Sequence, residues 1–311
     1  MPLRIVQSKQ NVRLKELRRA LAHPGRDAHG RAGIEGPNLL EEALRAGVRV
    51  ACVFVAEGAE PLVEALQLPA ETDVLLLPRD LLNSALATET PQPIAALIET
   101  PSWAWPEILG GQSKAAPLIV VLAGLQDPGN LGTILRSAEA FGADGVVCLP
   151  GTVSVWNSKA VRASAGSVFR VPVLAADAED CFARLRKAGA TIWTTAVHGA
   201  EPADRVDLAG PVALLIGNEG NGVPDALAAQ ADGALTIPCP GPVESLNAAV
   251  AASVLLYEAS RQRSGADVVA SRPSHNRPTN EDLSVGTPEA RRVGHPADQK
   301  TVPTTTAGRA R

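Results

Sequence analysis

Aromatic residues are scarce in this chain and make up 3% of its 311 residues. No run of eighteen apolar residues occurs, which argues against a membrane-spanning helix. The first ten residues, MPLRIVQSKQ, lack the apolar segment of a secretion signal. The cysteines show no paired metal-ligand spacing, so we expect no metal, reduced thiols and a cytoplasmic location. They are Cys52, Cys148, Cys181 and Cys239.

The apolar residues that are present are mostly Ala, Val and Leu, within a hydrophobic content of 45%. Small aliphatic side chains suit layered α/β folds with parallel strands. The length predicts two domains and a tail. We therefore expect an α/β protein with two cores.

Charge is distributed unevenly along the chain. The net charge of −4 alone argues against a nucleic-acid partner. Residues 1–31, however, hold eight basic and two acidic residues, whereas residues 32–100 hold three basic and eleven acidic ones. A basic arm on an acidic body can steer a polyanion, although a solvated helix face explains the same charges equally well.

The first hundred residues alternate between predicted helices and strands, which indicates a compact α/β domain over residues 1–100. A basic amphipathic helix is expected over 9–22, with Val12, Leu14, Leu17 and Leu21 on its apolar face. It is followed by a strand near Ile34, a helix at 37–47, a strand at 50–56, a helix at 60–66, a strand at 73–77, a helix at 78–86 and a strand near 93–98.

Residues 101–117 are rich in Pro, Gly and Ser and are predicted to be a linker. We expect its Trp103 and Trp105 to dock on a domain rather than to stack on a base. A second alternation over 118–263 has continuous apolar strands, which predicts a parallel sheet covered on both faces. Residues 264–311 have almost no large apolar side chains and are predicted to be disordered.

The loop LQDPGNLGTILRSA follows the first strand of the second alternation. Asn130 is a candidate N-cap of the next helix, and Arg136 lies about one and a half turns into it. An arginine near this edge of a sheet needs a partner, and a phosphate suits its planar group. A salt bridge to a nearby carboxylate is the alternative.

The loop LLIGNEGNGVP carries three glycines within six residues directly after a buried strand. Such a loop allows a ligand to approach the backbone closely. Its glycine order, Gly217, Gly220 and Gly222, matches neither the dinucleotide-binding nor the P-loop pattern, which disfavours an oxidoreductase. Glu219 has little local reason to stand there, and it can accept a hydrogen bond from a substrate or pair with Arg136.

The stretch LTIPCPGPVESLNAAVAAS places polar residues directly before a helix of small residues. Ser245 is a natural N-cap, and exposed amides at a helix start can hold an anionic or polar ligand. Plain capping also explains Ser245 and Asn247. A serine hydrolase is disfavoured because the G-x-S-x-G pattern is absent here.

The three loops together resemble the three motifs of the SpoU (TrmH) RNA ribose methyltransferases of the SPOUT superfamily. The matching segments are N-x-G-x-x-x-R at Asn130–Arg136, I-G-N-E-G-x-G at Ile216–Gly222 and I-P-x-x-G-x-V-E-S-L-N-A-A-V-A at Ile237–Ala251. The first hundred residues resemble, more loosely, the substrate-binding domain often joined to this family, including S-x-x-N-x-x-x-K at Ser8–Lys15 and I-E-G at Ile34–Gly36.

The resemblance implies an α/β fold whose C-terminal parallel sheet carries a deep trefoil knot, preceded by a smaller α/β substrate-binding domain. It implies a homodimer that transfers a methyl group from S-adenosylmethionine to a ribose 2′-hydroxyl of RNA, without a metal. Large-subunit (23S) ribosomal RNA is the expected substrate and transfer RNA the second. A non-catalytic ribosome-assembly factor with the same fold is the alternative.

The resemblance also assigns residues. The catalytic set would be Arg136, Asn130, Glu219, Ser245 and Asn247, with Arg136 holding a substrate phosphate and stabilising the developing alkoxide rather than acting as the base. The cofactor would contact, largely through main-chain atoms, Gly217, Ile237, Leu246, Ala196 and Asn218. The basic arm would bind RNA in a salt-dependent way through Lys9, Arg13, Lys15, Arg18, Arg19 and Arg31.

Overall fold

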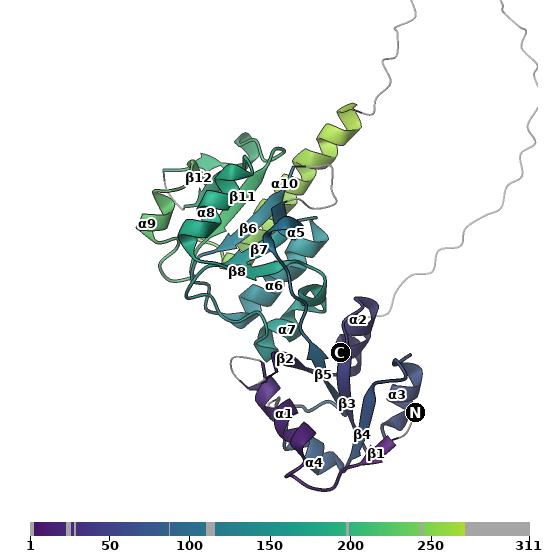
Figure 1. The fold of residues 1–311 in the computed structure, drawn as a ribbon. Helices are drawn as coiled ribbons and strands as arrows, with labels where there is room; N and C mark the ends of the chain where they lie inside the picture. The colour runs from purple at the N-terminus through teal and green to yellow at the C-terminus, as the bar shows by residue number, and fades with distance from the viewer. Residues whose placement is uncertain are drawn as a thin grey trace, which may run out of the picture. The chain divides into compact units, whose positions relative to one another are not determined.

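The computed structural model describes residues 3–22, 26–27, 29–86, 88–109, 116–196, 199–242 and 245–270. These residues form two β-sheets with helices packed on them (Figure 1). None of the helices within these ranges is long and apolar enough to cross a membrane. Most of the tail predicted to be disordered, residues 271–311, lies outside the described residues.

The first sheet has five strands in the order β1-β4-β3-β5-β2. Its strands are β1 (Leu3–Ile5), β2 (Arg31–Glu35), β3 (Val50–Ala56), β4 (Asp73–Leu77) and β5 (Ile94–Glu99), and its helices are α1 (Val12–Leu21), α2 (Pro37–Arg45), α3 (Glu60–Ala65) and α4 (Arg79–Asn83). Strand β5 runs antiparallel to β2 and β3, and the other pairs are parallel. The predicted alternation is therefore present, with β1 as an additional edge strand.

Helix α1 begins where Asn11 Oδ1 accepts a hydrogen bond from the Leu14 backbone N–H at 3.1 Å. Its buried side chains include Leu14, Leu17 and Leu21, three of the four residues expected on its apolar face. The fourth, Val12, is 69% exposed. The amphipathic pattern therefore leaves the basic residues of α1 on the outer side of the helix.

The second sheet has seven strands in the order β10-β12-β9-β11-β6-β7-β8, and every pair is parallel. The strands are β6 (Leu118–Leu122), β7 (Gly145–Cys148), β8 (Val173–Ala175), β9 (Thr191–Thr195), β10 (Glu201–Pro202), β11 (Val212–Ile216) and β12 (Gly233–Thr236). All residues of β6 and β11 are buried, as expected for central strands covered on both faces. The prediction of a parallel, doubly covered sheet is confirmed.

Two apolar clusters cover the faces of this sheet. One holds residues of α6 (Pro128–Ala140), α7 (Ser158–Ser164) and α10 (Ala248–Ala270). The other holds Ile108 of α5 (Trp105–Leu109) together with Phe182 and Leu185 of α8 (Ala178–Lys187). The short helix α9 (Asp225–Ala228) and the 3₁₀ turns Ser167–Phe169 and Ala203–Arg205 complete the chain order.

The structure corrects several element boundaries. The predicted linker contains helix α5, whose Ile108 is fully buried. Helix α10 begins at Ala248, three residues after the expected cap Ser245, and continues to Ala270, beyond the predicted end of the second alternation at residue 263. Apolar side chains of the linker were therefore wrongly interpreted as loop residues. The trefoil knot stays a prediction, because strand order and register alone do not define a knot.

Candidate active site

The predicted cofactor residues come together at one edge of the seven-stranded sheet. Ala196, Gly217 and Ile237 are each the first residue after a strand, namely β9, β11 and β12. These strands are neighbours in the order β12-β9-β11 and run parallel. Neighbouring strands lie about 4.8 Å apart. The three backbones therefore end side by side, where open α/β sheets bind their ligands.

The β11–α9 loop folds back on its first residue. A Cβ atom on Gly217 would lie 2.1 Å from the backbone carbon of Gly222, so only glycine fits there. The backbone groups of Asn218 and Gly222 exchange two hydrogen bonds of 2.9 Å. The Asn218 side chain donates to the Gly124 carbonyl at 3.0 Å and accepts from the Gly220 N–H at 2.8 Å. Asn218 therefore holds this loop against the β6–α6 loop.

Asn130 joins the three predicted motifs. Its Nδ2 donates a hydrogen bond to Glu219 Oε1 at 2.6 Å, and its Oδ1 accepts one from Asn247 Nδ2 at 3.1 Å. The expected role of Asn130 as a helix cap is wrong, because α6 begins two residues earlier and Asp127 caps it by accepting from the Asn130 N–H at 2.8 Å. This leaves the Asn130 side chain free for the loops.

Asn247 has two roles at the start of α10. Its Oδ1 accepts from the N–H groups of Ala249 and Val250, at 2.9 and 3.3 Å, while its Nδ2 contacts Asn130. Asn247 is therefore the N-cap of α10, and the predicted capping by Ser245 is wrong. Ser245 and Leu246 are exposed at the end of the loop, and Leu246 is 37% exposed.

Arg136 lies in the third turn of α6 and is exposed. Among the described residues it forms no ion pair with Glu219, whose carboxylate accepts from Asn130 instead. The neighbouring face of α6 packs on α10: Ser137 and Ser253 share a hydrogen bond of 2.7 Å, and Phe141 meets Tyr257 edge to face at 5.8 Å between ring centroids. This packing fixes the helix that carries Arg136 relative to the loop that carries Asn247.

Asp127 was missed in the sequence, although Asp-Pro before an apolar helix is a recognisable helix start. Its Oδ2 accepts a hydrogen bond from Lys159 Nζ at 2.9 Å, at the start of α7. This bond and the one from the Asn130 N–H lower the pKa of Asp127. Asp127 and Lys159 therefore link α6 to α7 and fix the helix turn that carries Asn130.

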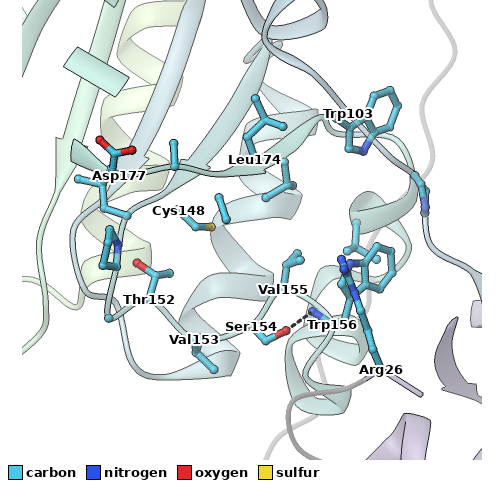
Figure 2. Close-up of a pocket in the computed structure, with 18 residues that line it drawn as sticks. Arg26, Trp103, Cys148, Thr152, Val153, Ser154, Val155, Trp156, Leu174 and Asp177 are labelled. Atoms are coloured by element: carbon cyan, nitrogen blue, oxygen red, sulfur yellow. Dashed lines mark hydrogen bonds between the residues drawn. The ribbon is translucent and has the colours of Figure 1, made fainter. Parts of the chain in front are cut away.

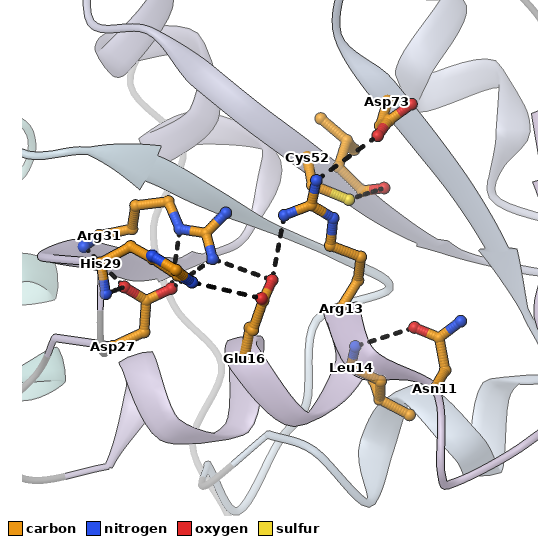
Figure 3. Close-up of polar contacts among 10 residues, drawn as sticks. Asn11, Arg13, Leu14, Glu16, Asp27, His29, Arg31, Cys52 and Asp73 are labelled. Carbon is orange, nitrogen blue, oxygen red and sulfur yellow. Dashed lines mark hydrogen bonds and ion pairs between the residues drawn. The ribbon is translucent and has the colours of Figure 1, made fainter.

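Two of the predicted RNA-binding residues lie in an ion-pair cluster in the first sheet (Figure 3). Arg31, only 8% exposed, pairs with Asp27 at 2.6 Å and Glu16 at 2.9 Å. Arg13 pairs with Glu16 at 3.1 Å and Asp73 at 4.0 Å. Both arginines are paired with carboxylates, so they offer a polyanion less positive charge than the unpaired basic residues of the arm.

The other basic residues of the arm are arranged differently. Lys15, Arg18 and Arg19 of α1 line one shallow surface hollow of about 310 Å³ together with Ala22. Lys9 is exposed before the helix. Only Lys9 and these three residues of the predicted set therefore remain as candidate RNA contacts.

Comparison with known proteins identifies the family. The SpoU rRNA Methylase family matches residues 117–257, and the MRM3-like substrate binding domain matches residues 11–96. The 23S rRNA (guanosine(2553)-2′-O)-methyltransferase RlmP of Bacillus subtilis (strain 168) is 32% identical over 256 residues, which are 81% of this chain and 97% of that protein. The chain belongs to the SpoU rRNA methylase family.

Solved structures of SpoU methylases share the fold. AviRb of Streptomyces viridochromogenes, in complex with AdoMet, superposes with a TM-score of 0.71 at 30% identity, over 82% of this chain and 98% of that one. An AdoMet-bound rRNA methyltransferase from Sinorhizobium meliloti gives a TM-score of 0.72 at 30% identity, over 83% and 98%. The predicted class, an S-adenosylmethionine-dependent RNA ribose methyltransferase, is confirmed.

The residues at the strand ends of this SpoU methylase fit the cofactor chemically. Ile237 and Leu246 offer apolar surface for a flat ring, Ile237 half-buried and Leu246 exposed. Gly217 and Ile237 each carry a main-chain N–H donor and a C=O acceptor, and the Ile237 carbonyl accepts from Cys239 Sγ at 3.4 Å. A cavity of about 650 Å³ lies elsewhere: the carboxyl ends of β7 and β8 line it, and none of the predicted cofactor residues does (Figure 2).

Proposed function

We propose that this chain methylates a ribose 2′-hydroxyl of 23S ribosomal RNA, working as a homodimer in the cytoplasm. The observation that carries the proposal is the side chain of Asn130, which bonds Glu219 and Asn247 and so joins all three motif loops. The substrate assignment rests on the 32% identity to an enzyme named for 23S rRNA 2′-O-methylation. The cellular location follows from that substrate.

Bound S-adenosylmethionine supplies an activated methyl group on a sulfonium, so the protein has no leaving group to activate. Ala196, Gly217, Ile237 and Leu246 would hold it, and the residues of the loops would position the ribose. Most of the rate enhancement then comes from orientation of the hydroxyl. Asn218 supports the loop and need not contact the cofactor itself.

Arg136 is the residue we assign to the charge that develops on the ribose oxygen. Its exposure leaves the guanidinium accessible to an RNA phosphate and to the attacking oxygen. A guanidinium holds its own proton at all ordinary pH values, so Arg136 stabilises the alkoxide rather than removing the proton. Asn130, Glu219 and Asn247, which their hydrogen bonds hold together, would form a polar wall of the ribose site, and Ser245 would complete it.

The homodimer is supported by an apolar stripe on α10. Val250, Val254 and Tyr257 recur every three or four residues along α10 and are 48%, 39% and 54% exposed, and Leu246, 37% exposed, lies just before the helix. Side chains with this spacing share one helix face. A second copy of the chain covers such a self-complementary face in a two-fold dimer. We assign the stripe to the dimer interface, next to the loops of the active site.

The RNA surface of the first sheet would consist of Lys9, Lys15, Arg18 and Arg19. Its contribution is electrostatic and therefore depends on salt. Arg13 and Arg31 instead stabilise the fold.

The proposed function is tested by incubating the purified chain with S-adenosylmethionine and unmodified 23S rRNA, followed by mass spectrometry of RNA fragments. A ribose 2′-O-methyl group at one nucleotide is expected, and unmodified RNA would contradict the proposal.

A further inference from the structure

One cavity in the described part of the chain is lined by none of the residues assigned to the cofactor or to the ribose. It lies at the carboxyl ends of β7 and β8 and has a volume of about 650 Å³, which is in the usual range for small-molecule sites. Trp103 and Trp156 lie towards one end of it, and Thr152 and Asp177 towards the other (Figure 2). The proposed mechanism uses none of these residues.

The polar side chains of the cavity are already engaged. Thr152 Oγ1 accepts from the Gly124 N–H at 3.2 Å and donates to the Leu122 carbonyl at 3.0 Å. Asp177 Oδ1 caps α8 by accepting from the Asp180 N–H at 2.8 Å. The wall therefore offers a ligand mainly apolar and aromatic surface, with the Asp177 carboxylate towards one end and one cation towards the other: the Arg26 guanidinium lies over the Trp156 ring, 5.7 Å from its centroid.

This surface suits a flat ring joined to a phosphate. Unpaired RNA bases stack on aromatic side chains, and the phosphate beside such a base attracts an arginine. Trp156 is 4% exposed and is covered by Arg26, whereas Trp103 is only half-buried. Trp103 is therefore the indole with surface available for a base.

The loop that lines the cavity is hydrogen-bonded to the loop that leads to the proposed ribose site. The Val153 N–H donates to the Leu125 carbonyl at 2.8 Å, which ties the β7–α7 loop to the β6–α6 loop that precedes Asn130. The Gly124 carbonyl in turn accepts from Asn218 of the second motif. One short RNA strand is therefore the ligand that this continuity fits.

We propose that this cavity binds an unpaired base of the substrate RNA next to the methylated nucleotide, with Trp103 as the stacking surface and Arg26 as the phosphate contact. This inference rests on the proposed function. It replaces our expectation that Trp103 only docks the linker on a domain. The site would select RNA whose target nucleotide has an unpaired neighbour.

The test measures binding of a synthetic 23S rRNA fragment that contains the methylated nucleotide, and of copies in which each unpaired neighbour is abasic. For the wild type and Trp103→Phe, one abasic position should weaken binding about tenfold. Trp103→Ala should bind the intact fragment about tenfold more weakly and lose nothing further at that position. Trp105→Phe, on the core side of α5, is the matched control and should behave as the wild type.

If removing the base weakens RNA binding equally in the wild type and in Trp103→Ala, the proposed subsite is overturned. If Trp103→Ala no longer binds S-adenosylmethionine, its fold is damaged and Arg26→Gln decides instead. Several-fold weaker binding by Arg26→Gln supports the site, and wild-type affinity overturns it. Methylation of the intact fragment by the wild type separates the two proposals. If the wild type does not methylate it, the proposed function fails and the subsite fails with it. If the fragment is methylated but the effect of the abasic position does not depend on Trp103, only the subsite is overturned.

Discussion

Asn130 Nδ2 lies 2.6 Å from Glu219 Oε1, a hydrogen bond between residues 89 positions apart in the sequence. The carboxamide can donate here because Asp127 has taken over the capping of α6. On its other side, the same group accepts from Asn247. One neutral side chain thus fixes an acidic loop and a helix start in a single arrangement, and the predictions below depend on it.

Removing this bridge should impair the chemical step more than the binding of the cofactor. For Asn130→Ala we expect kcat/KM to fall at least tenfold with S-adenosylmethionine affinity unchanged within about twofold, because proper positioning accounts for much of the rate. Asn130→Ala combined with Glu219→Gln should lose little more than either change alone, because contacting residues are coupled. Fully additive losses would mean that the two side chains act separately. Single-turnover kinetics and calorimetry give these quantities.

Arg136→Ala should reduce methyl transfer at least a hundredfold, the size expected when a group that stabilises developing negative charge is lost. Calorimetry should still show S-adenosylmethionine binding, because Arg136 is not among the strand-end residues. Arg162→Ala, an exposed arginine on α7, is the matched control and should keep its activity. Loss of cofactor binding with partly retained activity would show that the role of Arg136 is misassigned.

Alanine substitutions of Asn247 and Ser245 should have different effects on the free energy of unfolding. Asn247→Ala removes the acceptor that caps α10 and should lower the free energy of unfolding by about 1 kcal/mol. Ser245→Ala should change it by no more than about 0.5 kcal/mol, as for other exposed positions. Urea unfolding followed by circular dichroism measures both. A larger loss for Ser245→Ala would restore that residue as the cap.

The ion pairs around Arg31 should make the free energy of unfolding fall as the pH falls into the acid range. Burial opposes ionisation of Asp27, but hydrogen bonds from Arg31 and from the His29 N–H outweigh it and lower the pKa of Asp27. A lowered pKa in the folded state means that the stabilisation is complete above the unfolded pKa and disappears as the pH falls through the folded one. Asp27→Asn should therefore lower stability at pH 6 and much less at pH 2. Equal losses at both pH values would contradict this.

The basic residues should divide into two groups by their salt dependence. Joint replacement of Lys15, Arg18 and Arg19 by Ala should lower the slope of log affinity for RNA against log salt by about two to three. Arg31→Ala should instead destabilise the fold by about 3 kcal/mol or more, because it leaves the Asp27 carboxylate, whose side chain is 1% exposed, without its ion-pair partner. Filter binding at several salt concentrations and urea unfolding distinguish the two effects.

The sequence predicted most of the fold because its strands are continuous apolar runs between strong turn signals. Strands β3 at Val50–Ala56 and β4 at Asp73–Leu77 match their predicted ranges residue for residue. Helix α5 was missed because Pro106 and neighbouring polar residues look like a linker, and only the tertiary packing of Ile108 makes it part of the core.

The hydrogen bonds among the candidate site residues could not be predicted from the sequence. The family resemblance assigned Asn130, Glu219 and Asn247 to one site, yet which of them caps a helix depends on where α6 and α10 begin. The Asn130 side chain can either cap α6 or hydrogen-bond the other two loops, and the sequence does not distinguish these roles. The charge of Arg31 was likewise visible, but Glu16 and Asp27 neutralise it only after the chain has folded.

The most direct test of the account is methyl transfer to RNA by the wild type and by Arg136→Ala under the same conditions. The purified chain, S-adenosylmethionine and unmodified 23S rRNA are combined, and ribose methylation is mapped by mass spectrometry. The account predicts one 2′-O-methylated nucleotide with the wild type and none with Arg136→Ala, although both bind the cofactor. Methylation on a base, or equal ribose methylation by both proteins, would contradict it.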